Sequence, residues 1–424
     1  MTCSQQTNRA RCKQVPLLAQ SGQRQEQNVC FEQDAYSFCL RPKPLHPRIL
    51  QSYKITCKRL LSHHGMNMFP TQEKGTVTHK KRIVVVGAGI TGVSIAWHLA
   101  HREFDVTLIE KDMPASGATG SAFGWLTGVV KGDAADVLIR RAALTDWHRL
   151  EEHLPELNIK WSGSLTYGAA SGSCLQDERL LHKAEIARLE PALKNPPSEA
   201  RYAAKDGAID AVSATRLLLD KACEKGVVLN TQTTVTGLCM TEGKLTGVLT
   251  SRGKLDADCV VLACGTGIPA LTERVGIHVP VISSPAILLR FAASRNVVNT
   301  ILSGDDIEVR QAHNGDLLAA EDYPANGNVR ETAEAAQRAV RIRLTGAESA
   351  ALLQYSTGER PVIQDGYPVL GFADESRTVY ITSMHPAVTC AATIGRLVSE
   401  ELGNGQSNEI PQCYRPSRFS VLKG

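Results

Sequence analysis

The spacing of hydrophobic residues changes along the chain after Lys81, and the change predicts a strand followed by a helix. Residues 82–86 read RIVVV, a β-branched run typical of a strand buried on both faces. From Ile90 to Ala100 the apolar residues recur at helical spacing. A second strand pattern, DVTLIE, ends at Glu110. The order of strand, helix and strand predicts the repeating unit of a parallel α/β sheet.

Three glycines, Gly87, Gly89 and Gly92, occupy the turn between the first strand and the helix as GxGxxG. The first permits a tight turn, the second lets the backbone approach a pyrophosphate, and the third lets the helix pack close to the strand. The phosphate would lie at the helix N-terminus, where N–H groups favour an anion. Glu110 follows 18 residues after Gly92, where a carboxylate can bind the ribose hydroxyls of a dinucleotide. The order predicts a dinucleotide site, and a glycine turn without a ligand is the alternative.

The glycine turn does not distinguish NAD from FAD, but the segment after the second strand bears on the choice. Residues 115–128 read ASGATGSAFGWLTG, a run of small residues. Small side chains let backbone amides wrap closely around a pyrophosphate and an isoalloxazine ring. By turn chemistry alone, the same run is equally consistent with a flexible loop.

Alternating patterns return in the last third of the chain. SPAILLRF at 284–291, DIEVRQA at 306–312 and GDLLAAED at 315–322 predict strands of an antiparallel sheet. ETAEAAQRAVRIRL at 331–344 predicts a helix on the edge of that sheet. A small-molecule pocket is expected where this sheet meets the dinucleotide-binding domain.

The first 80 residues differ in composition from the rest. They carry 12 Lys and Arg against 4 Asp and Glu, whereas the remaining chain has 35 against 39. They lack apolar periodicity, so we expect residues 1–80 to be a disordered extension, or an artefact if translation starts at Met66 or Met68. A mitochondrial presequence is the alternative, against which Glu26, Glu32 and Asp34 argue. The expected location is cytoplasmic, or mitochondrial if the extension is a presequence.

Several other protein classes are disfavoured. No apolar run approaches the roughly 18 residues that span a bilayer, so we expect no transmembrane segment. The 12 cysteines include no CxxC pair and no His companion at ligand spacing, so neither a metal site nor a disulfide framework is expected. A mildly acidic body gives no electrostatic footprint for nucleic acid.

Glu110, ASGATG and SAFGW together resemble the FAD-binding N-terminus of the D-amino-acid oxidase superfamily, which includes glycine oxidase, the sarcosine oxidases and many D-amino-acid dehydrogenases. Further segments resemble this superfamily in the same order along the chain. They are EIARLEPAL at 185–193, TTVTGL at 233–238, ADCVVLACGTGIPAL at 257–271, STGERPVIQDGYPVLG at 356–371 and MHPAVTCAATIGRLVSEEL at 384–402. The resemblance covers nearly all of residues 81–419.

The resemblance implies an α/β fold, with a discontinuous Rossmann-like FAD-binding domain and an α+β substrate domain built on an antiparallel sheet. The expected segments are 81–160, 200–275 and 355–402 for the FAD-binding domain, 161–199 and 276–354 for the substrate domain, and 403–424 for a C-terminal tail.

The resemblance also implies non-covalent FAD. Monomeric sarcosine oxidases attach flavin through a cysteine in the segment matching STGERP, and dimethylglycine and sarcosine dehydrogenases use a histidine near GATGSAFGW; this chain has neither residue there. The cofactor-binding residues expected from the glycine turn and the resemblance are Gly87, Gly89, Ile90, Thr91, Gly92, Glu110, Lys111, Ser116, Gly117, Ser121, Trp125, Val235, Cys264, Gly265, Gly267, Ala387, Val388 and Thr389.

Two residues are expected to act on the substrate. In glycine oxidase and D-amino-acid oxidase the arginine matching Arg360 binds the substrate carboxylate, a task that suits a guanidinium because it forms two parallel hydrogen bonds. The alternative is a salt bridge, for example with Glu359. His385 stands where the superfamily has a histidine in a GHSGVT-like motif, and a structural turn histidine is the alternative. Pro386 and Ala387 replace the usual serine or asparagine and glycine.

The function expected from these motifs is FAD-dependent oxidation of the CH–NH bond of a small amino acid or secondary amine, by hydride transfer to flavin N5 and imine hydrolysis. One alternative is an NAD-dependent dehydrogenase, which shares the glycine motif. The other is an FAD-binding subunit without catalytic activity. Side-chain preference, oligomeric state and the electron acceptor, which is oxygen, a quinone or an electron-transfer protein, stay open.

Overall fold

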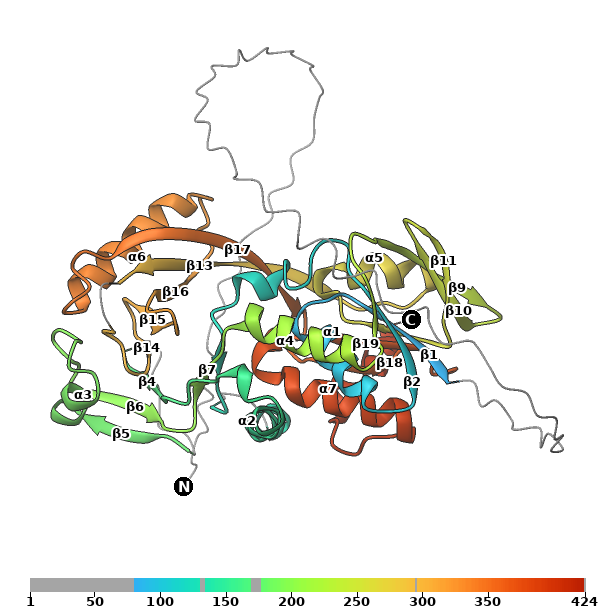
Figure 1. The fold of residues 1–424 in the computed structure, drawn as a ribbon, viewed down its shortest axis with the longest axis horizontal. Helices are drawn as coiled ribbons and strands as arrows, with labels where there is room; N and C mark the ends of the chain where they lie inside the picture. The colour runs from blue at the N-terminus through green and yellow to red at the C-terminus, as the bar shows by residue number, and fades with distance from the viewer. Residues whose placement is uncertain (1–79, 130–133, 169–176, 294–295, 423–424) are drawn as a thin grey trace, which may run out of the picture. The chain divides into compact units, whose positions relative to one another are not determined.

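The computed structural model describes residues 80–129, 134–168, 177–293 and 296–422. The expectations for the N-terminal extension and a presequence concern residues 1–80, of which all but the last lie outside the described part. Within the described chain the backbone forms two large sheets (Figure 1).

The first large sheet is built around β1, whose last four residues are buried on both faces as the RIVVV pattern predicts. It is parallel except for β18, which runs antiparallel to β19. β1 pairs with β2 on one side and with β12 on the other, which is the doubly wound arrangement. Across the sheet the strands are β18 (Val369–Phe372), β19 (Val379–Ser383), β12 (Cys259–Leu262), β1 (Lys81–Val86), β2 (Phe104–Ile109) and β8 (Val228–Asn230).

Helices cover one face of this sheet (Figure 1): α1 (Ile90–Ala100), α2 (Ala134–His153), α4 (Ala211–Glu224) and α7 (Ala387–Asn404). α1 and α7 pack very closely, because a Cβ on Gly395 would overlap Ser94 and His98. The Ser94 hydroxyl donates to Ala391 O at 2.7 Å. Burial lowers the pKa of His98 to about 4, so this ring is neutral between the two helices at physiological pH.

A small antiparallel sheet covers the opposite face, where Leu245 and Val248 pack on Val84 and Val260. Its strands are β11 (Gly253–Asp256), β10 (Lys244–Thr250) and β9 (Val235–Thr241). The parallel sheet is therefore covered on both faces, as parallel sheets require.

The second large sheet has eight strands, antiparallel apart from the parallel pair β4 and β14. Its order is β17 (Ala351–Ile363), β13 (Val281–Ala292), β16 (Leu317–Asp322), β15 (Glu308–Gln311), β14 (Ile301–Ser303), β4 (Ser164–Thr166), β6 (Glu199–Ala203) and β5 (Arg179–His182). Helix α6 (Val329–Arg343) packs on one face through Ala333 and Val340. The antiparallel sheet and the helix are confirmed, but the helix lies on a face of the sheet rather than on its edge, because its buried Ala333 and Val340 join the core of that face.

Shorter elements complete the described chain. They are β3 (Trp125–Leu126), β7 (Gly207–Ala208), α3 (Lys183–Leu189), α5 (Ile268–Thr272), and the 3-10 helices η1 (Ala118–Ser121), η2 (Pro155–Leu157), η4 (Gly265–Gly267), η5 (Glu273–Val275), η6 (Gln412–Tyr414) and η7 (Pro416–Leu422).

Two predicted domain boundaries fall inside strands of the eight-stranded sheet. The boundary at 355 lies within β17, which pairs with β13 along its whole length, and the boundary at 199/200 lies within β6. Arg360 therefore comes from the substrate sheet rather than from the cofactor segment 355–402. The other boundaries stay predictions.

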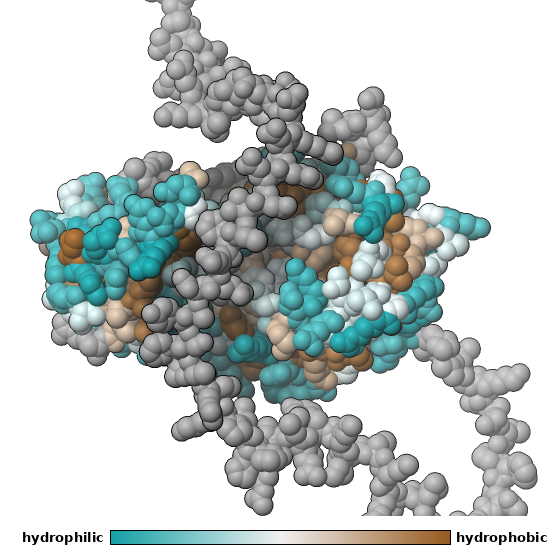
Figure 2. Space-filling view, turned by 90° about the horizontal axis from the view of Figure 1, so that it is seen from above, coloured by the Kyte–Doolittle hydropathy of each residue, from teal (hydrophilic) through white to brown (hydrophobic). Residues whose placement is uncertain are grey.

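Hydrophilic residues cover most of the described surface visible in Figure 2, with hydrophobic residues in small groups between them. None of the helices in the described residues combines the length and apolar character needed to cross a membrane.

Candidate active site

The predicted cofactor residues gather at one edge of the parallel sheet. β1, β2, β12 and β19 are parallel neighbours in register, so their carboxyl ends meet there. Gly87 N–H donates to Ile109 O at 2.8 Å, and Ala263 N–H donates to Val86 O at 2.9 Å. This edge, where the connections leave β1 and β12 in opposite directions, is where doubly wound sheets bind ligands.

The glycine turn has the backbone that its sequence predicts. Gly87 has φ +101°, and a Cβ there would lie 2.7 Å from Ala263 O. A Cβ on Gly92 would overlap Gly87 O. In the first turn of α1, Ile90 N–H donates to Thr119 Oγ1 at 3.0 Å, while the N–H groups of Thr91 and Gly92 have no carbonyl partner within the helix. These N–H groups suit an anionic phosphate.

Glu110 is fixed at the tip of β2. One carboxylate oxygen accepts from Ala88 N–H at 2.7 Å and the other from Asp112 N–H at 3.0 Å. Thr233 N–H donates to Glu110 O at 2.9 Å, which brings the start of β9, with Val235, to the same edge. Lys111 is exposed, and its ammonium lies 3.9 Å from the Asp112 carboxylate.

Residues 115–128, which we call the cofactor loop, are held by hydrogen bonds from three other parts of the chain. Trp125 Nε1 donates to the buried Asp206 at 2.9 Å, and Thr389 Oγ1 donates to Trp125 O at 2.9 Å. Arg310 Nε donates to Phe123 O at 2.6 Å. These bonds argue against the flexible-loop alternative.

The cofactor loop also leaves room for a ligand. Ser116 and Gly117 are exposed, and nothing lies within 4 Å of where a Gly117 Cβ would stand. Ser121, at the end of η1, packs against Gly358 of β17. The loop therefore lies between the glycine turn and the substrate sheet.

The remaining cofactor candidates lie after β12 and at the start of α7. Cys264 precedes Gly265 and Gly267, and burial raises the pKa of its thiol to about 12, so this group is neutral. α7 begins at Ala387, and no side chain caps it. Its first turn, Ala387 to Thr389, is anchored where Trp147 Nε1 donates to Thr389 O at 2.9 Å.

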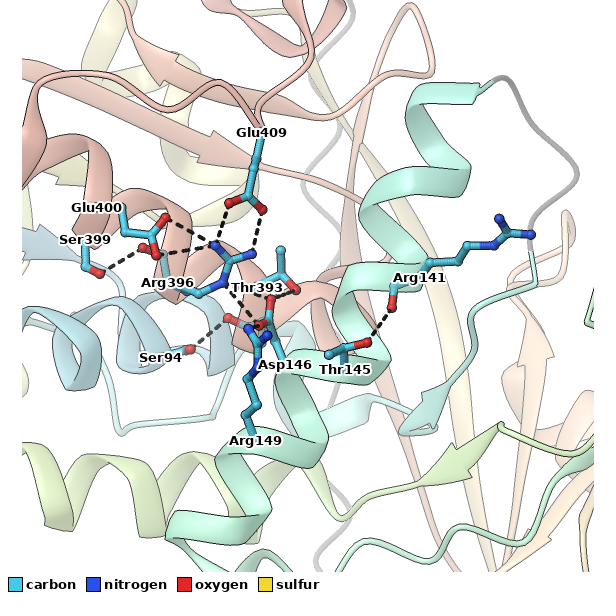
Figure 3. Close-up of polar contacts among 11 residues, drawn as sticks. Ser94, Arg141, Thr145, Asp146, Arg149, Thr393, Arg396, Ser399, Glu400 and Glu409 are labelled. Carbon is cyan, nitrogen blue, oxygen red and sulfur yellow. Dashed lines mark hydrogen bonds and ion pairs between the residues drawn. The ribbon is translucent and has the colours of Figure 1, made fainter.

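α7 is further held by a buried ion-pair cluster (Figure 3). Asp146 of α2 accepts from Arg396 Nε at 3.1 Å and from the Thr393 hydroxyl at 2.7 Å. Arg396 also binds Glu400 at 3.2 Å and Glu409 at 2.9 Å, and these carboxylates raise the pKa of Arg396 despite its partial burial. The cluster fixes α2 and the C-terminal segment against the helix whose N-terminus faces the site.

Arg360 projects from β17 and is partly held by its neighbour β13. Its Nε donates to Ser284 O at 3.1 Å, and its Nη2 donates to Ser284 Oγ at 3.1 Å. The predicted salt bridge with Glu359 is replaced by one with Asp322, whose Oδ1 lies 3.4 Å from Nη2. Asp322 is 92% exposed, and Glu359 instead accepts a hydrogen bond from Ser283. Among the described residues no hydrogen bond involves Nη1, so one end of the guanidinium is open.

His385 is exposed and lies within the electrostatic reach of Arg360. Desolvation by the surrounding protein lowers the pKa of His385, and the positive charges of Arg360 and Arg140 lower it further, against the opposing effect of Asp322. The ring is therefore neutral at physiological pH. The charge of Arg360 thus acts on His385, and the roles of both residues toward the substrate stay predictions.

Sequence reasoning missed several residues of this region. Thr119 and Asp206 hold the cofactor loop, Arg310 joins it to the substrate sheet, and Asp322 pairs with Arg360. The available signal was a charged residue inside an alternating strand, as at Arg310.

The fold and this edge define a class of nucleotide-binding oxidoreductases with a separate substrate sheet. A family described as "FAD dependent oxidoreductase" matches residues 82–401, so the chain belongs to this family. Membership of this family assigns FAD as the cofactor, and the NAD-dependent alternative is set aside. The glycine turn and the open space at Gly117 fit a dinucleotide with a pyrophosphate.

Individual relatives are distant. The chain is 28% identical over 246 residues to 4-methylaminobutanoate oxidase (formaldehyde-forming) of Paenarthrobacter nicotinovorans, covering 53% of this chain and 29% of that protein. It is 24% identical over 336 residues to glycine oxidase of Geobacillus kaustophilus, covering 73% and 89%. The crystal structure of the latter enzyme superposes with a TM-score of 0.71 at 20% identity, covering 80% of this chain and 99% of that one, and supports the fold.

The chain spans 29%, 55% and 57% of three curated relatives that it matches, the second being a bifunctional ThiO/ThiG protein and the third a D-amino acid dehydrogenase.

Proposed function

We propose that this protein oxidises the CH–NH bond of a small amino acid or secondary amine that carries a carboxylate. The observation that carries the proposal is the position of Arg360. Its Nε and Nη2 are engaged by Ser284, which fixes the guanidinium plane, while Nη1 forms no hydrogen bond among the described residues. A guanidinium held in this way binds a carboxylate through Nη1 and Nη2, displacing Asp322 from Nη2.

The residues of this chain would then orient the substrate and hold the cofactor without a covalent bond. FAD, when bound, supplies a hydride acceptor at N5. The N–H groups of Thr91 and Gly92 would hold the pyrophosphate, and Glu110 the ribose. The uncapped first turn of α7 would stabilise negative charge near the flavin. Neutral His385 accepts or donates one hydrogen bond without adding a charge, and water would hydrolyse the imine product.

The test is anaerobic reduction of the purified flavoprotein by a panel of amino acids and secondary amines. Acid denaturation first establishes whether FAD is released, as expected for non-covalent binding. Bleaching of the visible flavin absorbance by members of the panel that carry a carboxylate supports the proposal. A folded protein that retains FAD and is bleached by none of them would contradict it and favour an FAD-binding subunit without this activity.

A further inference from the structure

The eight-stranded sheet has two chemically different faces. Leu289, Val309 and Ala319 pack with Ala333 of α6 in one apolar core. Because side chains alternate along a strand, the residues next to them in sequence face the opposite way. We call this opposite face the site face.

Cross-strand pairs identify the charged residues of the site face. Glu308 precedes Val309 and pairs with Ser303, so it lies on the site face of β15. Asp322 pairs with Ala286 and Arg360 with Ser284, and both β13 residues alternate with the core residue Ile287. The site face therefore carries Glu308 on β15, Asp322 on β16 and Arg360 on β17. Arg310, two residues after Glu308, also lies on this face, and its guanidinium is held by Phe123 O and Ile209 O.

This face meets the cofactor loop. Gly358 lies on the site face two residues before Arg360, and a Cβ there would stand 2.9 Å from Ser121 Cβ. At the other side, Arg310 of β15 donates to Phe123 O of the same loop. The site face, on which Glu308 lies, therefore contacts the cofactor loop both at Gly358 and at Arg310.

Glu308 is a half-buried carboxylate without a cation against it. Its one hydrogen bond within the described chain comes from the Ser303 hydroxyl, at 3.1 Å. The pKa of Glu308 is raised to about 6 by burial and by the carboxylates of Glu321 and Asp322, against the opposing hydrogen bond from Ser303 and the positive charge of Arg360. Burying a carboxylate without a counter-charge costs free energy, which a bound cation would recover.

The spacing of the strands limits which class of substrate can supply that cation. Arg360 Nη2 reaches Asp322 on β16, which is the strand next to β15. Val309 pairs with Ala319, so Glu308 stands one strand across and two residues along from Asp322. With strands about 4.8 Å apart and about 3.3 Å per residue, the guanidinium at Asp322 and the Glu308 carboxylate are on the order of 8 Å apart. The carboxylate and ammonium of an α-amino acid are closer together, at roughly 3 Å from standard bond geometry.

We propose that Glu308 binds a positively charged nitrogen of the substrate that lies several ångströms from the carboxylate held by Arg360. This inference rests on the proposed function and names its substrate class. The shared chemistry is a carboxylate and a cationic nitrogen separated by several bonds. Two kinds of compound supply it: ω-amino acids, with or without an N-alkyl group, and α-amino acids with a basic side chain.

The test compares Glu308→Gln with wild type in anaerobic flavin reduction. The substrates are glycine, D- and L-alanine, ω-amino acids of three to six carbons, ornithine and lysine. Wild type is expected to prefer the compounds with separated charges, and Glu308→Gln to lower their kcat/KM by about 10–100-fold, as for loss of one charge-assisted hydrogen bond. The effect on glycine and alanine should stay below about threefold. A preference for ω-amino acids or for ornithine and lysine assigns the source of the nitrogen.

Glu321→Gln is the matched control. Glu321 is also a carboxylate whose pKa is raised by burial, but it pairs with Ile287 of the core and so faces away from the site. Because the Glu321 charge raises the pKa of Glu308, the variants are compared at a pH well above 6, where Glu308 is ionised with or without Glu321. There Glu321→Gln should leave every kcat/KM within about twofold of wild type. FAD content and thermal unfolding establish that both variants are folded, and Glu308→Asp should recover part of the lost activity.

The outcomes separate the two proposals. The role of Glu308 would be overturned if wild type is bleached by the panel but Glu308→Gln affects all substrates equally. It would also be overturned if wild type prefers glycine and alanine. In both cases the proposed function would stand. Absence of bleaching by every compound would overturn the proposed function and the role of Glu308 together.

Discussion

Replacing Arg360 with alanine tests the carboxylate site most directly. The change removes the guanidinium whose Nη1 is open and whose Nη2 is shared between Ser284 and Asp322. We expect FAD binding to persist, because the glycine turn, Glu110 and the cofactor loop are held by other residues. Turnover of substrates that carry a carboxylate should fall.

The size of the loss follows from the hydrogen bonds available. Two charge-assisted bonds to a carboxylate contribute about 1.5–3 kcal/mol each. Arg360 is 33% exposed and must release Asp322 when the substrate binds, which favours the lower end of that range. A total of about 3 kcal/mol corresponds to a decrease in kcat/KM of about 150-fold.

Asp322→Asn distinguishes a binding arginine from a structural salt bridge. If Arg360 binds the substrate, Asp322 competes with it for Nη2, so this variant should lower KM by about two- to fivefold. The assay is stopped-flow reduction of the flavin without oxygen, with FAD content as a control. Unchanged kcat/KM in Arg360→Ala, or equal losses in both variants, would show that Arg360 serves the fold alone.

Three further results are expected. Gly92→Ala should abolish FAD binding and lower the free energy of unfolding by about 2 kcal/mol, because the new Cβ would overlap Gly87 O. The control Gly237→Ala, whose Cβ would meet open space, should keep full FAD content. Asp146→Ala should lower the free energy of unfolding by about 3 kcal/mol in denaturant titrations, because it uncouples α2 from Arg396 and Thr393. As a control, replacing the exposed Glu334 with alanine should lower it by under about 0.5 kcal/mol. Glu308→Gln should stabilise the ligand-free protein by about 1–2 kcal/mol above pH 6. The pKa of Glu308 is about 6 in the folded protein, against an ordinary value of 4.5. The folded state therefore binds more protons than the unfolded state between pH 4.5 and 6, so wild-type stability falls as the pH rises through this range. A Glu308→Gln variant with the pH dependence of wild type would contradict this.

The parallel sheet and its glycine turn were predictable because their causes are local. A β-branched run, three glycines and an acid at fixed spacing determine β1, the tight turn at Gly87 and the place of Glu110. The strands of the substrate sheet were also readable from alternation.

The pairings across the site were not predictable, because they depend on which strands become neighbours. The partner of Arg360 is Asp322, distant in sequence, and the adjacent Glu359 faces Ser283 instead. Glu308 and Glu321 look alike in sequence, yet register places them on opposite faces. The motif around Arg360 also concealed that β17 belongs to the substrate sheet, because the resemblance associates that motif with the flavin.

The strand order of the parallel sheet bears on how the protein is made. β1 is synthesised early, but its neighbour β12 comes much later and β19 later still, so the centre of the sheet cannot close until Val379–Ser383 has left the ribosome. Until then the apolar strand Cys259–Leu262, fully buried in the finished sheet, has an unpaired edge that can associate with other chains.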